Sequence, residues 1–497
     1  MPQKNTPPTT KPHYLVLLLG LCLWQSSLLY ANDSIWYNSD DPLKTEAFTP
    51  PPIPDGYLES SACNTGSYDH TLTLTEVVEA ALCNNPQARA AYASAKLQAA
   101  QLGIAKSAYL PLVNDNISNN LNWANPELAA RNNPYSNLSN NIVASYLLYD
   151  FGNRDANLEN ARQLLQAASA SQNSAVQTIL LNAIQAYYQV QASMAAVAAA
   201  RESERASEES FKAAQARYTA GVSTPADKLQ AQTLFAQNSL SRITAEGSLN
   251  NAYGSLANVM GIPANRALKL TPSVLQQALP NIEQDINALI EQARLRRPDL
   301  IASEAQLKAA EASINASRAA AKPSISVAAS NSLIDGSRLS TSNNTAVGIT
   351  LSIPLFAGYA PTYRIRSAEA NAELRTAQRD QLRLQISLEV WRAYQSLVTA
   401  NESIRAVAVL VSSAQESSRV AFGRYKAGVG NILDTLNAQS ALASALQQQI
   451  QANLNWNIAR TTLAQSIGSL DNAMIQSLPT GNNQANALNA QTPERQP

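Results

Sequence analysis

The chain has 497 residues, and its 36 lysine and arginine side chains balance its 36 aspartate and glutamate side chains. Because the formal net charge is zero, the chain lacks the basic excess that binds nucleic acid, and we expect no nucleic-acid partner. Charged residues make up 14% of the chain, against about 25% in an average soluble domain, and Asn, Gln and Ser supply much of the remaining polarity.

The first 31 residues have the features of an export signal. Two lysines precede an apolar run from Leu15 to Leu23, and residues 29–31 form a plausible though imperfect cleavage site. The run is too short to span a bilayer as a helix. A leucine rather than a small residue precedes Cys22, which disfavours lipid attachment there. We therefore predict a signal peptide over 1–31.

Residues 32–71 are rich in proline and are expected to form an extended segment rather than a domain. After removal of the signal, two cysteines remain, Cys63 and Cys83. In an oxidising compartment a lone pair of cysteines most simply forms a disulfide, which here would tie the extended segment to the first helix. The alternative is two unrelated thiols.

Two repeats follow, over 72–283 and 284–478, and they share a pattern of helix breaks. In the first repeat, a helix is expected to be interrupted at Pro86 and to end before Pro111. The second repeat has prolines 212 positions after each of these, at 298 and 323. The matched spacing predicts a duplicated pair of helices.

A pair of strands is predicted after each helix pair, at about 110–150 and 323–357, because side-chain polarity alternates there. In the first strand the polar row is Asn114, Asn116, Ser118, Asn120 and Asn122. The opposite row is Val113, Ile117, Leu121 and Trp123, interrupted by Asp115 and Asn119. In the return strand we expect Val143, Leu147 and Tyr149 to share one side. The second repeat alternates more cleanly, with Val347, Ile349, Leu351, Ile353 and Leu355 in one row.

A very long helix is predicted after Gly152, since residues 153–218 contain neither proline nor glycine. At 1.5 Å per residue this helix would span about 100 Å. Its apolar residues repeat in alternating steps of four and three, which is typical of a helix packed in a coiled coil. A glycine at 358 marks the same point in the second repeat.

The turn that ends the long helix is written twice. Residues 217–232 return, with changes, as residues 424–439, a distance of 207 positions. Both copies match Arg-Tyr-x-Ala-Gly-Val-x-x-x-x-Asp-x-Leu-x-Ala-Gln. The duplication favours a symmetric assembly over a single catalytic pocket. The tail 479–497 is polar and is expected to be disordered.

The strands predict a closed tube made by several chains. Unpaired backbone groups at a sheet edge cost several kcal/mol each in lipid, and membrane barrels need at least eight strands. Four strands per chain would therefore require partners, and twelve strands from three chains is a natural closure. The alternative is a soluble sandwich of the four strands.

No catalytic constellation is present in the sequence. Of two histidines, His13 leaves with the signal, and His70 alone supplies neither a His-based zinc site nor a catalytic triad. The phosphate-binding Gly-x-x-x-x-Gly-Lys-Ser/Thr motif is absent. We expect no enzyme activity, no cofactor and no metal, so that any energy comes from a partner.

Over residues 70–475 the strand pairs, the broken helices and the doubled turn resemble the TolC-type outer membrane efflux proteins. The resemblance implies a homotrimer with a twelve-stranded transmembrane β-barrel in the outer membrane and an α-helical barrel in the periplasm. It also implies docking to a periplasmic adaptor (a membrane fusion protein) and an inner-membrane transporter, as in tripartite efflux or type I secretion. The cargo, small toxic molecules or polypeptides, stays open.

The resemblance also assigns roles at the two turns. Gly221-Val222 and Gly428-Val429 match the tip that meets the adaptor. The periplasmic entrance and its gate are matched by Asp227, Asp434, Tyr218, Tyr425 and Asn437. Acidic side chains there would favour cations, and the tyrosines could hold the mouth shut. An equally simple role for the two aspartates is helix capping, and the two roles are compatible.

The sequence departs from the family pattern at two positions. Gly430 stands where some members have an arginine that helps to lock the closed state, and Asn437 stands where some have a second acid. We therefore expect a weak lock and a weak acidic ring. The rival interpretations are a coiled-coil envelope stalk without a channel and a periplasmic adaptor.

Overall fold

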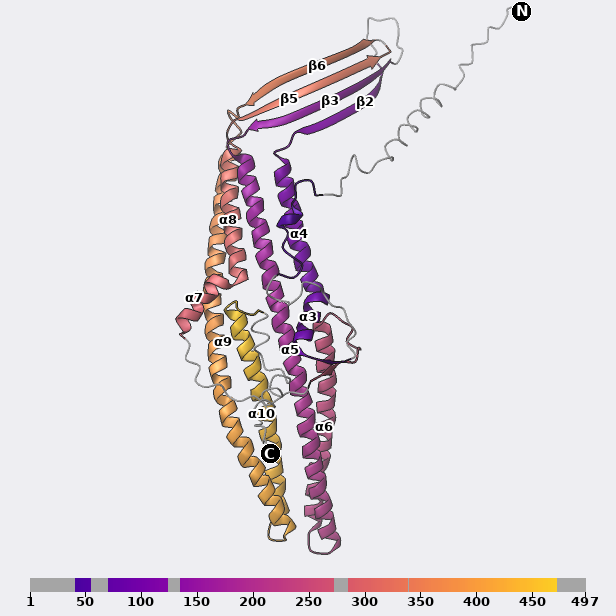
Figure 1. The fold of residues 1–497 in the computed structure, drawn as a ribbon, viewed down its shortest axis with the longest axis vertical. Helices are drawn as coiled ribbons and strands as arrows, with labels where there is room; N and C mark the ends of the chain where they lie inside the picture. Colours follow the sequence, from indigo (N-terminus) through magenta and orange to yellow (C-terminus); the bar gives the residue numbers. More distant parts are fainter. Residues whose placement is uncertain (1–40, 55–69, 124–134, 272–284, 338, 472–497) are drawn as a thin grey trace, which may run out of the picture.

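The computed structural model describes residues 41–54, 70–123, 135–271, 285–337 and 339–471. They form an elongated body with an antiparallel sheet at one end and two helical hairpins whose turns lie at the other end (Figure 1). The predicted fold class, an α+β chain with an internal duplication, long helices and four amphipathic strands, is confirmed.

The two repeats contain the same elements in the same order. Along the described residues these are η1 (Glu46–Phe48), β1 (Thr71–Leu72), α3 (Leu74–Asn84), α4 (Pro86–Ser107), β2 (Leu112–Asn122), β3 (Tyr135–Tyr149), α5 (Asn153–Thr219), α6 (Pro225–Val259), β4 (Lys269–Leu270), α7 (Ile286–Arg296), α8 (Pro298–Ala319), β5 (Ser324–Gly336), β6 (Leu339–Ser352), α9 (Ala360–Lys426) and α10 (Ile432–Ser466). The parallel pairing of β1 with β4 is not predicted by the sequence, because two residues are too few to show a period.

The long helices α5 and α9 contain 67 residues each, or about 100 Å of helix. Each begins just after a residue in the left-handed conformation, Gly152 with φ 87° and Tyr359 with φ 62°. The same left-handed step therefore turns the chain from strand to helix in both repeats.

The helix breaks of the two repeats are fixed by different side chains. Asn85 separates α3 from α4, and its Nδ2 donates to the Val259 carbonyl oxygen at 3.0 Å. Arg297 separates α7 from α8, and its Nη1 lies 3.5 Å from the Ser466 carbonyl oxygen. In both repeats the break is hydrogen-bonded to the last residue of the second helix of the hairpin, α6 or α10. The break therefore holds each hairpin to its pair of short helices.

Arg297 is only 7% exposed, and its guanidinium is neutralised by two acids. Its Nη2 lies 2.6 Å from Asp299 Oδ2, and its Nη1 lies 2.5 Å from Glu389 Oε2. A buried charge without such partners would be strongly destabilising. The second repeat therefore places a buried ionic cluster where the first repeat has a neutral amide.

Apolar cores lie at the level of these breaks. One core packs α3 against α5 and α6 and includes Val77, Leu180 and Met260. A second packs α7 against α9 and α10 and includes Leu289 and Trp456. No helix of the described residues is both long and apolar enough to cross a membrane.

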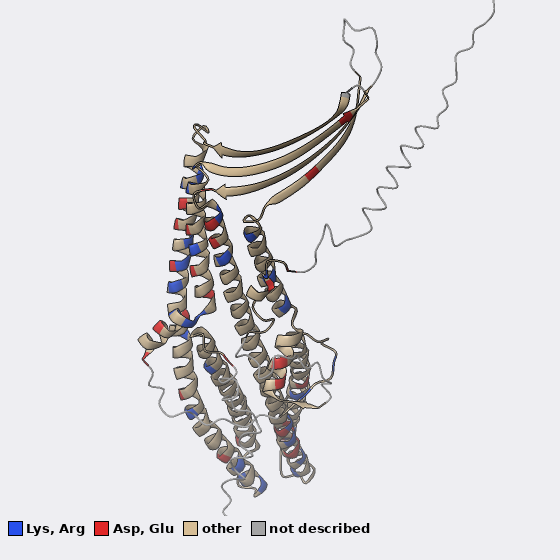
Figure 2. Cartoon of the chain, turned by 45° about the horizontal axis from the view of Figure 1, so that its top comes forward, with Lys and Arg blue, Asp and Glu red and all other residues tan. Residues whose placement is uncertain are grey.

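The main sheet has the order β2-β3-β5-β6 and is antiparallel throughout. The two repeats meet at β3 and β5, so β2 and β6 are the edges. The strands contain no lysine or arginine and only two acids, which Figure 2 shows as isolated red positions.

Residues paired directly across antiparallel strands point to the same face, so the register defines two faces. One face carries an apolar set with interspersed polar residues: Val113, Ile117, Leu121, Leu138, Ile142, Tyr146, Val327, Leu333, Val347 and Ile349. The other is dominated by Asn and Ser, including the predicted row from Asn114 to Asn122.

The expected row of β3 is wrong in part. Val143 lies opposite Asn114, and Leu147 lies opposite Ser326, so both belong to the polar face. Tyr149 lies opposite Ile325, because the register shifts between Leu147 and Tyr149 and returns the tyrosine to the apolar side. An irregularity of this kind exchanges the two faces without changing the alternation of the sequence.

Several predictions fall on other parts of the chain. The signal peptide 1–31, the tail 479–497 and Cys63 lie outside the described residues, whereas Cys83 is disulfide-bonded. The Cys63–Cys83 pairing and the domain boundaries stay predictions. Within the proline-rich segment, the Pro51 carbonyl oxygen accepts from Gln172 Nε2 at 2.8 Å, so this part is tied to α5.

We predict that Gly261→Ala destabilises the protein far more than Gly221→Ala. Both glycines have a left-handed φ, 72° and 71°, so alanine costs about 1–2 kcal/mol at either position. At Gly261 an added Cβ would also lie 2.6 Å from the Asn84 carbonyl carbon, whereas nothing lies within 4 Å at Gly221. Thermal unfolding followed by circular dichroism measures the difference. An equal decrease in unfolding temperature for the two variants would contradict the close approach of Gly261 to the Asn84 backbone.

Candidate functional site at the hairpin tips

The two hairpin turns, joining α5 to α6 and α9 to α10, lie next to each other at the end of the molecule remote from the sheet (Figure 1). Arg217 Nη1 donates to the Tyr425 carbonyl oxygen at 3.1 Å and so connects them. The structure thus brings together the two copies of the doubled motif, which are 207 positions apart in sequence.

Both turns use the same backbone motif. Gly221 and Gly428 adopt φ 71° and 81°, and the amides of Val222 and Val429 donate to the Arg217 and Arg424 carbonyl oxygens, both at 3.0 Å. This left-handed helix end satisfies carbonyl groups that the helix leaves unpaired. The two valines are 63% and 71% exposed. Each tip therefore presents a small apolar side chain on a rigid turn.

Asp227 is part of a capping box at the start of α6. Its carboxylate accepts from the Thr224 amide at 3.1 Å and from Ser223 Oγ at 2.8 Å, while the Asp227 amide donates to Thr224 Oγ1 at 3.2 Å. The hydrogen bond from the Thr224 amide, followed by that from Ser223, lowers the pKa of the Asp227 carboxyl. Asp227 therefore caps its helix, which is compatible with a position near the entrance.

Asp434 is placed differently from Asp227. In the second hairpin Asn431 is the cap, and its side chain accepts from the Leu433 amide at 3.1 Å. Asp434 and Asn437 are both exposed and line a groove of about 470 Å³ on α9 and α10. Identical sequence positions thus differ in local role, because a serine and a threonine precede Asp227 where the second copy has Gly430 and Asn431.

The two predicted gate tyrosines do not share one environment. Tyr218 is 41% exposed, whereas Tyr425 is 4% exposed and packs with Ala214, Ile432 and Leu436. Burial raises the pKa of the Tyr425 hydroxyl, and this hydroxyl has no hydrogen-bond partner among the described residues. The gate role of the two tyrosines therefore stays a prediction.

Arg217 is the tip residue that sequence reasoning missed. Its guanidinium carbon lies 5.1 Å from the centre of the Tyr425 ring, in addition to the hydrogen bond to the Tyr425 backbone. A cation over an aromatic face contributes about 0.5–1 kcal/mol at an exposed site and more when desolvated. The signal was available, since arginine opens both copies of the motif.

The backbone around Gly430 leaves little space for a side chain, which matters because some family members are expected to have an arginine at this position. A Cβ at this position would lie 2.9 Å from the Tyr425 amide nitrogen and 3.0 Å from the Arg424 carbonyl carbon. Any side chain would therefore push the turn away from the end of α9. At this backbone geometry the second tip has no room for an arginine.

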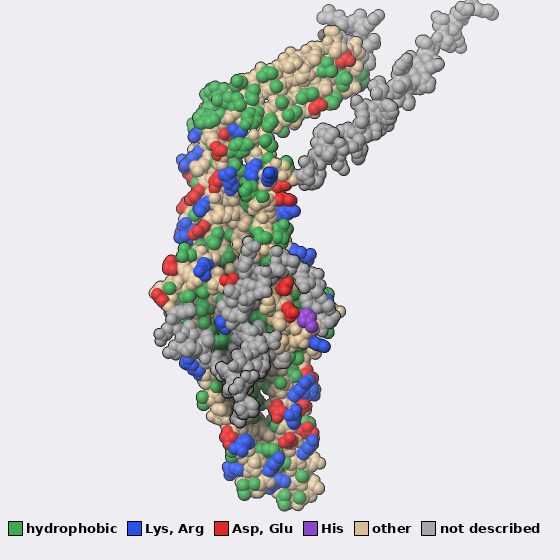
Figure 3. Space-filling model, in the orientation of Figure 1, with side chains coloured by type: hydrophobic (Ala, Val, Ile, Leu, Met, Phe, Trp, Pro, Cys, Tyr) green, Lys and Arg blue, Asp and Glu red, His purple; other side chains and the backbone are tan. Residues whose placement is uncertain are grey.

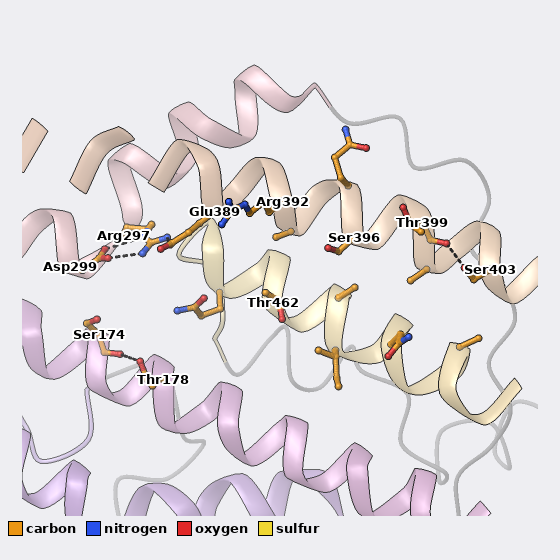
Figure 4. Close-up of a pocket in the computed structure, with 18 residues that line it drawn as sticks. Ser174, Thr178, Arg297, Asp299, Glu389, Arg392, Ser396, Thr399, Ser403 and Thr462 are labelled. Carbon is orange, nitrogen blue, oxygen red and sulfur yellow. Dashed lines mark hydrogen bonds and ion pairs between the residues drawn. The ribbon is translucent and has the colours of Figure 1, made fainter. Parts of the chain in front are cut away.

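A polar cavity of about 940 Å³ lies between α5, α9 and α10, above the tips (Figure 4). Hydroxyl side chains line it, among them Ser174, Ser396 and Thr462, and the Arg297 cluster closes one end. None of the predicted site residues lies there. In the described residues no group of three or more His, Cys, Asp or Glu could hold a metal ion.

Two long hairpins beneath a sheet with one polar and one apolar face define the class of the protein, a membrane channel subunit with a helical extension. The family model described as outer membrane efflux protein matches residues 77–262 and 289–469. These ranges cover most of both repeats and more than half of the chain.

Individual proteins give the same result. The chain is 29% identical over 416 residues to protein CyaE of Bordetella pertussis strain Tohama I, covering 82% of this chain and 86% of CyaE. It is 26% identical over 421 residues to outer membrane efflux protein BepC of Brucella suis biovar 1, covering 83% and 89%. A solved structure of CusC has a TM-score of 0.72 at 22% identity, covering 84% and 97%, and thus has the same fold.

The chain therefore belongs to the outer membrane efflux protein family. It is an outer-membrane channel protein of efflux or type I secretion, with its helical part in the periplasm. The family is one of transport proteins rather than enzymes. The alternative of an envelope stalk or adaptor without a channel is set aside.

We predict that the first turn of α6 loses protection from hydrogen exchange as the pH falls below about 4. The pKa of Asp227 is lower in the folded chain than the usual value of about 3.9. Its contribution to stability is therefore complete above that value and is lost as the pH falls through the folded pKa. Thr224→Ala should lower local stability by about 1 kcal/mol at neutral pH.

Hydrogen–deuterium exchange, corrected for the intrinsic pH dependence of amide exchange, measures this protection. Asp227→Asn is the control, because an amide at this position does not titrate and its protection should not change between pH 3 and pH 5. A wild-type profile as flat as that of Asp227→Asn would show that the capping carboxylate does not stabilise the turn.

Proposed function

We propose that three copies of this chain join their sheets, edge to edge, into a twelve-stranded barrel that continues as a helical barrel into the periplasm. The observation that carries the proposal is the four-stranded sheet with unpaired edges β2 and β6. In lipid each unpaired N–H or C=O group at these edges costs several kcal/mol. An antiparallel pairing of β6 with β2 of the next copy continues the alternating strand directions of the sheet and leaves no unpaired edge.

The two faces of the sheet fit the two sides of such a wall. The Asn- and Ser-rich face would line the water-filled lumen, and the more apolar face would contact lipid. Where the sheet meets the helices, hydrophobic side chains gather on the surface (Figure 3). Phe356 and Tyr359 are 77% and 69% exposed there, as suits aromatic residues at a membrane interface.

At the other end, the Gly-Val turns support docking of a periplasmic adaptor. Val222 and Val429 are exposed on turns whose backbone is fixed by hydrogen bonds, so a partner meets a preformed apolar knob on each hairpin. An inner-membrane transporter joined through the adaptor would supply the energy. The amide and hydroxyl groups of the lumen contact many solutes weakly, so the choice of cargo falls mainly to the transporter.

The entrance acids support a preference for cations. Three copies of Asp434 would surround the mouth as a ring of exposed carboxylates, and Asp227 would add three more that are partly engaged in capping. Carboxylate rings attract cations and repel anions. Asn437 adds no charge, so the ring is weaker than one with a second acid.

We predict that the purified trimer forms pores in planar bilayers and that these pores prefer cations. Asp434→Asn should reduce the reversal potential in asymmetric KCl, and Asp227→Asn should reduce it as well, because the hydrogen bonds from the Thr224 amide and Ser223 keep the Asp227 carboxyl ionised. The trimer should persist in both variants. A folded sample without conductance would defeat the channel, and an unchanged reversal potential would defeat only the entrance assignment.

We predict that Val429→Trp impairs export while the trimer still assembles in the outer membrane, because the bulky ring disturbs only the apex of the hairpin. Export by cells that carry the variant, compared with trimer abundance in the membrane fraction, measures the effect. Leu97→Trp is a matched control, since Leu97 is also exposed (57%) but lies on α4, away from the tips. Normal export with Val429→Trp would refute docking at the tip.

A further inference from the structure

Where the sheet meets the helices, the second repeat exposes two cations that have no acidic partner. Lys322 follows the end of α8, and Arg366 lies in the second turn of α9. Further from the sheet, Arg318 Nη2 lies 2.8 Å from Glu369 Oε1 and joins the same two helices. Lys322 and Arg366, which we call the boundary cations, therefore lie on the sheet side of this ion pair. Among the described residues neither of them forms a salt bridge.

Lys322 is connected by side-chain contacts to the apolar face of the sheet. Its Nζ lies 5.9 Å from the centre of the Phe151 ring. The Phe151 ring in turn meets the Tyr149 ring edge-on, with 4.8 Å between the ring centres. Tyr149 belongs to the apolar face, because it lies opposite Ile325 in the register. The ammonium group is thus placed just below the surface that would contact lipid.

Arg366 is reached from the sheet through a second row of aromatic side chains. The Phe356 ring meets the Tyr359 ring edge-on at 5.5 Å between centres, and Tyr363 follows one turn later on α9. Arg366 Cζ lies 5.8 Å from the centre of the Tyr363 ring, which is 65% exposed. Aromatic rings followed by cations are typical of the boundary between hydrocarbon and water. Basic side chains lie just below the hydrophobic surface in this region (Figure 3).

The first repeat satisfies its own cations at the same level. Arg154 Nε lies 3.2 Å from Asp150 Oδ2, and Lys106 Nζ donates to the Leu43 carbonyl oxygen at 3.3 Å. The first turn of α5 also contains Asp155, whereas the first turn of α9 contains no acid. The positive end of the α9 dipole and the boundary cations therefore reinforce each other without an internal anion. This excess of positive charge is specific to the second repeat.

An anion that fits this place needs an apolar part as well as a charge. Its charge would contact Lys322 and Arg366, and its apolar part would lie against Phe151, Tyr149 and the apolar face beyond them. Lysine and arginine bind phosphate oxygens through charge-assisted hydrogen bonds. A phosphate that carries acyl chains meets both requirements, whereas a free phosphate uses only the cations.

We propose that the boundary cations bind the headgroup of an anionic glycerophospholipid, whose acyl chains lie along the apolar face of the sheet. The inference rests on the proposed barrel, in which that face contacts lipid. The lipid belongs to the leaflet that faces the periplasm, because the boundary cations lie where the sheet passes into the helices. Each chain has one such site, and all its residues come from the second repeat and the start of α5.

Native mass spectrometry of the full-length protein in neutral detergent tests the site. The probes are dioleoyl phosphatidylglycerol and dioleoyl phosphatidylcholine, which have the same acyl chains and differ in headgroup charge. We expect one phosphatidylglycerol per chain, bound more tightly than phosphatidylcholine. Each cation near an anionic lipid strengthens binding about fivefold, so Lys322→Gln with Arg366→Gln should weaken phosphatidylglycerol binding about 25-fold. Binding of phosphatidylcholine should stay the same.

A matched double variant controls for the loss of charge. Lys308→Gln with Arg364→Gln also removes one lysine and one arginine, both exposed and both without a salt bridge among the described residues. Lys308 lies several turns further from the sheet on α8. Arg364 is two positions before Arg366 and so points to the opposite side of α9. This control should bind phosphatidylglycerol as the wild type does.

The outcomes separate this site from the proposed function. Equal affinity of the wild type for the two lipids, or an equal loss in both double variants, would overturn the site. Displacement of the lipid by millimolar inorganic phosphate would overturn the assignment to a lipid. The same spectra report the number of copies: a monomer would defeat the proposed barrel, while the lipid count per chain still tests the boundary cations.

If the variants do not fold, the wild type alone decides. Raising the ammonium acetate concentration should weaken binding of phosphatidylglycerol and leave that of phosphatidylcholine unchanged, because salt screens exposed charges. A preference for phosphatidylglycerol that does not depend on salt would refute recognition by the boundary cations.

Discussion

The structure depends on one constraint, which is that the backbone polar groups at the edges of its sheet need partners when they are placed in lipid. Four strands with free edges at β2 and β6 cannot satisfy this alone. The pairing of β3 with β5 shows how the constraint is met inside the chain, because it joins the first repeat to the second. The helices below follow the same order, with α5 of the first repeat packed on α8 and α10 of the second.

Because of the duplication, both repeats have the same elements in the same order. The two copies differ at individual positions of their hairpin turns. The capping box of Thr224 and Asp227 has no counterpart at Asn431, whose own side chain caps α10. Gly430 is confined by the end of α9, whereas Ser223 in the first copy donates to Asp227. The tips are therefore equivalent in backbone and different in capping, so the entrance of the proposed trimer would repeat three times rather than six.

The sequence predicts those parts of the structure that local chemistry controls. The break at Pro86, the long helix after Gly152 and the left-handed turn at Gly428 follow from the backbone properties of single residues. The face of Val143 could not be predicted, because the shift near Tyr149 exchanges rows that alternate in the same way. The burial of Tyr425 and the exposure of Tyr218 could not be predicted either, since identical motifs differ only in what the fold packs against them.

The buried Arg297 makes the two halves of the chain unequal in the changes that they tolerate. Loss of the Asn85 side-chain amide removes two hydrogen bonds, one to the Val259 carbonyl oxygen and one from the Gln87 amide, and each contributes about 0.5–1.5 kcal/mol. Loss of both Asp299 and Glu389 would leave a buried guanidinium without an acidic partner, at a cost of about 3–5 kcal/mol. Substitutions can therefore accumulate one at a time at the helix break of Asn85, whereas at the break of Arg297 they need to be correlated. Positions 297, 299 and 389 are expected to vary together among descendants of this chain.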